Sequence, residues 1–179
     1  MKRGVRQALS FVLALVLAAL GVLAFRAVAF TIYTVDGEQL RPLLHRGDRV
    51  MVNRWSYGLR VGGGSLFSVG RIGCRPIERG DIVAFEASLH SADGVLLCRC
   101  RGIPGDTIEG RVVPGRITCA DQDYYWMEPL GPADHTGSRT LGLIREQQII
   151  GRAILIVYNH DDARHLFTGY RPGRVMIPL

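Results

Sequence analysis

Hydrophobic residues are concentrated near the start of the chain, where Leu, Val and Ala dominate Ala8–Phe25. The stretch Gln7–Phe25 contains 19 residues and no charge. A helix on the surface of a soluble domain shows a polar face, whereas about 20 apolar residues are enough to cross a hydrocarbon core. The pattern therefore predicts a transmembrane helix within residues 1–28, followed by a separate domain over residues 29–179.

The charges that flank this segment indicate its orientation. Lys2, Arg3 and Arg6 precede it, while Arg26 alone closely follows it. Cationic flanks stay on the cytoplasmic side, so we expect a single-pass protein of the cytoplasmic membrane with its N-terminus inside and its domain outside. The alternative is a cleaved secretory signal, because residues 27–29 read Ala-Val-Ala, the small-x-small form of a cleavage site. The lipid bilayer is an expected partner on the first interpretation.

After residue 28 the pattern changes to short runs rich in β-branched and aromatic residues, which are typical of strands. Gly- and Pro-containing turn signals separate them at residues 45–48, 79–81 and 104–106. One short helix is expected around Arg145–Gln148. The predicted strands are Ala29–Val35, Arg49–Asn53, Ile82–Glu86, Val95–Arg101, Thr107–Val113, Tyr124–Met127 and Ile149–Tyr158. This punctuation predicts a mainly β fold, an antiparallel β-domain of small sheets or a partly closed barrel.

The basic side chains exclude some chemistry. The formal net charge is +6, but the arginines are scattered and form no basic stripe, so nucleic acid is not an expected partner. The single lysine of the chain is Lys2, before the apolar segment. Arginine stays protonated at ordinary pH and cannot act as a general base.

Four cysteines, Cys74, Cys98, Cys100 and Cys119, follow the apolar segment. In an oxidising compartment they allow three complete disulfide pairings, and the sequence does not choose among them. Cys98 and Cys100 share one face of a predicted strand, where direct bridging is geometrically poor. No second cysteine pair or close histidine pair has zinc-ligand spacing, so neither a metal nor a cofactor is expected.

Five stretches, in order and spacing, resemble the type I signal peptidase family. They are Pro42–Asp48 (PLLHRGD, against P-T-L-x-x-G-D), Val52–Arg60 (VNRWSYGLR, against V-x-K-x-x-Y-G-x-R), Arg79–Phe85 (RGDIVAF, against R-G-D-I-V-x-F), Gly102–Asp106 (GIPGD, against G-L-P-G-D), and Ser138-Arg139 with Gly142 and Ile149–Ala153. The resemblance implies a membrane-anchored β-domain that removes signal peptides from secreted preproteins. It also implies a serine nucleophile, a buried lysine as general base and a second hydroxyl that helps to hold the oxyanion.

The sequence departs from the family at each of these catalytic positions. Counting from Pro42, the nucleophile position is Gln39 and the preceding hydroxyl position is Gly37. Counting back from Gly102, the lysine position is Cys98. A shift in register does not restore the pair, because no serine occurs between Phe30 and Asn53 and no lysine follows Lys2.

Parts of the last block are retained. Ser138, which the resemblance implies would orient the lysine, is present with Arg139, while the aspartate expected before them is Gly137. The sequence therefore predicts a protein without the dyad.

Two rewired sites are alternatives to the loss of activity. Cys98 would act as a nucleophile with a histidine base (one of His45, His90, His135, His160 and His165), but a small apolar residue that fills the space of the missing lysine is favoured. Asp36 and Glu38 share a strand face, and a solvated acidic edge is favoured over a carboxylate pair.

The binding apparatus is expected to remain. In the family an extended signal-peptide end inserts between two strand edges, here Val35–Leu40 and Val95–Cys98. The predicted substrate-binding residues are Val35, Asp36, Gly37, Leu40, Leu96 and Leu97. Bulky Glu38 and Gln39 would partly block the groove. The predicted role is non-catalytic: binding preprotein signal peptides or partnering an active signal peptidase. The alternatives are an active peptidase with non-standard residues and a structural subunit of a secretion complex.

Overall fold

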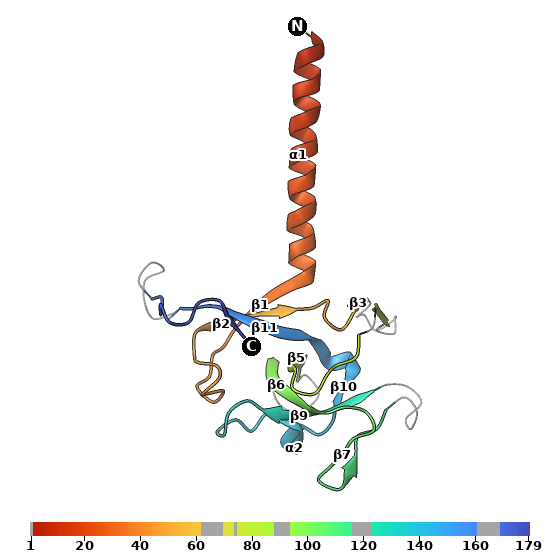
Figure 1. Ribbon diagram of the computed structural model, residues 1–179, viewed down its shortest axis with the longest axis vertical. Coiled ribbons are helices and arrows are strands. Elements are labelled where there is room, and N and C mark those ends of the chain that lie inside the picture. Colours follow the sequence, from red (N-terminus) through yellow and green to blue (C-terminus); the bar gives the residue numbers. More distant parts are fainter. Residues whose placement is uncertain (1, 62–69, 74, 88–93, 116–122, 161–168) are drawn as a thin grey trace.

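The computed structural model describes residues 2–61, 70–73, 75–87, 94–115, 123–160 and 169–179. Helix α1 (Lys2–Ala29) projects away from a β-domain that contains the rest of the described chain (Figure 1). In the part of the chain that the structure describes, no helix combines the length and apolarity that a membrane crossing needs. The transmembrane span expected within residues 1–28 is therefore not confirmed.

The mainly β prediction is confirmed, with one large antiparallel sheet in place of several small ones. Its strand order is β1-β2-β11-β5-β6-β9-β10, and β12 pairs with β11. The strands are β1 (Phe30–Thr34), β2 (Asp48–Asn53), β5 (Ile82–Glu86), β6 (Val95–Gly102), β9 (Tyr124–Pro129), β10 (Ile144–Arg145), β11 (Ile149–Asn159) and β12 (Ile177–Pro178). Two-stranded sheets are formed by β3 (Leu59–Val61) with β4 (Gly70–Ile72) and by β7 (Thr107–Ile108) with β8 (Arg111–Val112).

Six predicted strands lie within about two residues of observed ones, because runs of β-branched and aromatic residues bounded by turn signals are a strong signal. The single strand expected over Thr107–Val113 is wrong. Glu109 and Gly110 adopt positive φ angles of 52° and 76°, so the chain turns between β7 and β8. The short helix predicted around Arg145–Gln148 is present as a 3-10 helix, Glu146–Gln148. The short elements β3, β4, β10, β12 and helix α2 (Ser138–Leu141) were not predicted.

Two hydrophobic clusters pack on the sheet. Strand β5 is buried from Ile82 to Phe85, with Phe85 in one cluster and Ala84 in the other. Cys98 and Cys100 point into the first cluster, while Arg99 is exposed between them. The alternation expected for this strand is confirmed, and it places the lysine position of the family inside the core.

Candidate functional site

A cavity of about 370 Å³ lies between the chain that follows β1 and the beginning of β6. It is lined by Tyr33, Thr34, Val35, Asp36, Gly37, Gln39, Leu40, Val95, Leu96, Leu97, Asp134 and Thr136. All six residues predicted to bind substrate are among them. We call this cavity the β1–β6 groove.

One wall of the groove is a strand edge. Strand β9 pairs with β6 from Cys98 onward, so within the described residues Val95–Leu97 has no strand partner on that side. The other wall differs from the expected strand over Val35–Leu40. Strand β1 ends at Thr34, and the amide of Leu44 donates to the carbonyl of Leu40 (3.1 Å) in the turns that follow. A peptide backbone therefore finds ladder partners on the β6 side of the groove.

The nucleophile position lies at this groove, where exposed Gln39 lines the cavity beside Gly37. Glu38 turns away and pairs with Arg41 (3.1 Å), so it does not form a carboxylate pair with Asp36. The acidic-edge interpretation agrees with this arrangement. Behind Gln39, a Cβ added to Gly131 would overlap the Gln39 carbonyl oxygen, so glycine at 131 allows the two backbones to touch.

The base position holds a buried thiol. Cys98 is fully buried, and that burial raises the pKa of its thiol to about 12, although a hydrogen bond with Thr136 lowers it. Of the described histidines, none hydrogen-bonds to Cys98. A neutral thiol is a poor nucleophile. The geometry therefore supports Cys98 as a buried space-filling residue.

The other cysteine predictions are tested only in part. Cys98 and Cys100 are both free thiols. Burial raises the pKa of the Cys100 thiol to about 12 as well. Cys74, Cys119, His90 and His165 lie outside the described residues. Among the residues described, no group of three or more His, Cys, Asp or Glu side chains is placed to hold a metal ion.

Two groove residues that the sequence did not reveal are Thr136, which contacts Cys98, and Asp134, which accepts hydrogen bonds from Thr136. The Cys98 thiol donates to the Thr136 carbonyl oxygen (Sγ to O, 3.5 Å) and lies 3.8 Å from Thr136 Oγ1. The Thr136 hydroxyl and amide donate to Asp134 Oδ1 at 2.5 and 3.0 Å. No periodic pattern marks these residues, because they lie in the irregular loop between β9 and α2.

The retained residues of the last block have other roles. Ser138 is buried, and its Oγ accepts a hydrogen bond from the Met127 amide (2.8 Å), whereas the hydrogen bond of Cys98 is with Thr136. Arg139 pairs with Glu109 on the surface. A Cβ added to Gly137 would lie 2.6 Å from Pro129 Cδ. The tight backbone at Gly137 leaves no room for the aspartate that the family pattern has there.

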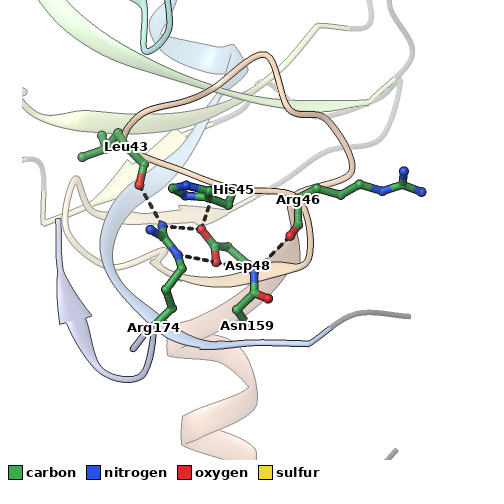
Figure 2. Close-up of polar contacts among 6 residues, drawn as sticks. All are labelled: Leu43, His45, Arg46, Asp48, Asn159 and Arg174. Atoms are coloured by element: carbon green, nitrogen blue, oxygen red, sulfur yellow. Dashed lines mark hydrogen bonds and ion pairs between the residues drawn. The ribbon is translucent and has the colours of Figure 1, made fainter. Parts of the chain in front are cut away.

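A buried ion pair fixes the chain that carries Gln39. Asp48 is fully buried and accepts from Arg174 Nη2 (2.6 Å) and Nε (3.0 Å) and from Asn159 Nδ2 (2.7 Å). Arg174 also donates to the Leu43 carbonyl (2.9 Å), as Figure 2 shows. Although burial raises the pKa of Asp48, these hydrogen bonds lower it overall. We call Asp48, Asn159 and Arg174 the Asp48 clamp.

Two other motifs that resemble the family each contain an aspartate, Asp81 or Asp106, whose hydrogen bonds stabilise the surrounding backbone. Asp81 accepts from the Tyr57 hydroxyl (2.8 Å) and pairs with Arg152 (3.2 Å). Asp106 accepts two hydrogen bonds from Arg79, at 2.8 and 2.5 Å, and one from the Ile103 amide. The motifs that carry the resemblance therefore hold the fold around the groove.

His45, beside the Asp48 clamp, is expected to make stability depend on pH. Burial and nearby Arg174 and Arg41 lower the pKa of His45. The unfolded chain, with a histidine pKa of about 6.5, therefore takes up this proton before the folded chain does. The contribution of neutral His45 to the free energy of unfolding is therefore present above about pH 6.5 and is lost as pH falls through the lower pKa of the folded state. His45→Gln should leave a smaller loss of unfolding free energy between pH 8 and pH 5, measured by chemical denaturation. An unchanged loss would contradict this assignment.

The comparisons with known proteins agree with this architecture. Residues 8–130 match the family model described as "Signal peptidase, peptidase S26". Over 96 residues, 54% of the chain, it is 35% identical to "Signal peptidase I S" of Bacillus subtilis (strain 168). The chain spans 42% of the length of that relative. The chain belongs to the S26 signal peptidase family, whose activity is that of a peptidase.

Proposed function

We propose that this chain is a non-catalytic signal peptidase homologue that binds the signal peptides of preproteins, alone or beside an active signal peptidase. The observation that carries the proposal is the combination of a preserved groove with unreactive groups at its two catalytic positions. Gln39 presents a carboxamide, which does not attack peptide bonds, and Cys98 presents a buried neutral thiol. The sequence supplies no lysine after Lys2.

The proposed location is the outer face of the cytoplasmic membrane, with the N-terminus inside. Large apolar side chains of α1 support lipid contact, because Phe11 is 71% exposed and Val22 is 67% exposed. At the domain end of the helix, the Phe25 and Trp55 rings meet with centroids 5.2 Å apart. Aromatic residues are enriched at membrane interfaces, so this pair suits the headgroup level.

The proposal predicts binding without cleavage. A photo-crosslinking residue at position 39, in the groove wall, should capture a preprotein that carries a signal peptide, and no shortened product should form. The matched control is the same residue at position 112, where Val112 is 60% exposed but outside the groove. The full-length protein in detergent is mixed with the preprotein and the products are resolved by mass spectrometry.

Each contrary result has a distinct meaning. Equal capture from positions 39 and 112 would contradict binding in the groove. Release of the signal peptide by the natural chain would contradict the non-catalytic role. Cleavage that is abolished in the Cys98→Ala variant would identify that thiol as the nucleophile.

A further inference from the structure

We infer that the β1–β6 groove selects extended peptides with a lysine side chain, whose ammonium group pairs with Asp134 beside Thr136. This inference rests on the proposed peptide-binding function and names the ligand chemistry that the groove takes. The first observation is a carboxylate oxygen of Asp134 that has no hydrogen-bond partner. Asp134 is 3% exposed, and its Oδ2 is buried without a hydrogen-bond partner, while Oδ1 accepts both hydrogen bonds from Thr136.

A buried carboxylate oxygen without a partner is costly, by about 1–3 kcal/mol or more for a charged group. Such groups are rare in folded proteins and call for a compensating ligand, water or ion. Asp134 lines the groove, so its carboxylate can accept a hydrogen bond from a donor that enters the groove. The carboxylate accepts and does not donate, which makes a cationic donor the matching chemistry.

The charge of the groove points to the same ligand. Among the described residues, Asp36 and Asp134 are its charged lining residues and none of the arginines lines it, although the whole chain carries a formal charge of +6. Asp134 also borders a second cavity, which contains Arg101 and Arg139. These arginines already pair with Glu128 and Glu109, respectively. A cation in the groove therefore meets an acidic surface that the protein itself does not neutralise.

The shape of the site favours lysine over arginine. With 3% of Asp134 exposed, a ligand reaches it only with a narrow end. The lysine ammonium is a compact charge on a thin four-carbon stem, whereas the guanidinium group is a wide planar fork. An ammonium beside Asp134 also lies near the Thr136 carbonyl and hydroxyl oxygens, which are acceptors. The aliphatic stem would lie against Leu96 and Leu97 on the β6 edge.

The test uses two acetylated and amidated apolar peptides that differ at one central position, lysine against norleucine. Blocked ends leave the side chain as the single source of an amine. The full-length protein in detergent should bind the lysine peptide about tenfold more tightly, which corresponds to about 1.4 kcal/mol. Asp134→Asn should reduce this preference to less than twofold, while Glu38→Gln, which removes a carboxylate that does not line the groove, should retain it.

The outcomes separate this inference from the function on which it rests. Equal binding of the lysine and norleucine peptides to the natural chain would overturn the inference and leave the groove as a peptide site. Binding of neither peptide would overturn both. Because the peptide pair alone tests the lysine preference, the result does not depend on folding of the Asp134→Asn variant. A preference that survives Asp134→Asn but disappears in Asp36→Asn would also overturn the assignment to Asp134.

Discussion

Asp48→Asn is expected to lower the free energy of unfolding by about 3 kcal/mol, because removing one member of a buried ion pair leaves the other charge unpaired. Arg174 is only 19% exposed and donates twice to Asp48, so its guanidinium would lose a bidentate partner. A carboxamide keeps one acceptor oxygen, so the variant side chain cannot accept at both of the positions that Arg174 and Asn159 Nδ2 occupy around Asp48. Chemical denaturation of the full-length chain in detergent, followed by fluorescence of buried Trp126, measures the change.

The exposed pair Glu38–Arg41 is the matched control. Both side chains are largely in solvent, at 63% and 48% exposure, so Glu38→Gln should cost no more than about 1 kcal/mol. The variant Arg174→Met should destabilise the protein as well. Combined with Asp48→Asn it should cost less than the sum of the two, since both disrupt one interaction. Additive effects, or a loss for Asp48→Asn no larger than for Glu38→Gln, would show that the clamp contributes little.

The clamp links stability to the groove. The Val35 amide donates to the Asp48 carbonyl (2.9 Å), and the Gly47 amide donates to the Val35 carbonyl (2.8 Å). These bonds close the loop between residues 35 and 48, which carries Gly37, Gln39 and Leu40. A variant that loosens Asp48 should therefore weaken peptide binding even though no clamp residue lines the cavity.

The sequence predicted the strands better than it predicted the site. Strand β2 alternates over its six residues, and β5 and β11 contain apolar runs, residues 82–85 and 153–158. Both patterns are strong signals of a strand. The two positions that the motif spacing indicates, Gln39 and Cys98, lie on the groove and in the core, respectively. Irregular backbone has no such period, so the sequence pattern does not distinguish the turns after Thr34 from a continued strand.

Side-chain partners that lie far apart in the sequence could not be predicted for the same reason. Asp48 is recognisable as part of a G-D turn, but its partner Arg174 lies 126 residues later and outside residues 8–130 that match the family. Asp134 and Thr136 are placed by the path of a loop, and Ser138 was a more conspicuous hydroxyl.

The same loop shapes the second large effect that we expect. The natural chain should show no peptidase activity, and the double variant Gln39→Ser with Cys98→Lys should acquire a measurable one. The first change supplies a hydroxyl nucleophile at the groove, and the second supplies an amine at the buried base position. Cleavage of a preprotein by the full-length variant in detergent is the measurement. Each single variant is the control, and both should be inactive because each lacks one half of the dyad.

The activity of the double variant should be weak at neutral pH because of Asp134. A general base must be unprotonated, and burial alone would lower the pKa of an amine at position 98. The charge of Asp134 already raises the pKa of Cys98, and the same charge would hold a proton on an amine there. A nearby carboxylate shifts a pKa by about 1–3 units. Cleavage should therefore increase as pH rises above neutrality.

Adding Asp134→Asn tests this explanation directly. Removal of the charge lowers the pKa of the introduced amine, so the triple variant should cleave about tenfold faster than the double variant at pH 7, since one pKa unit changes the free-amine fraction about tenfold. The two variants should converge at alkaline pH, where both amines are neutral. A uniform difference at all pH values would instead indicate that Asp134 acts through the position of Thr136. Complete inactivity of both, with peptide binding intact, would show that Gly37 and Gly137 remove more of the machinery than two substitutions restore.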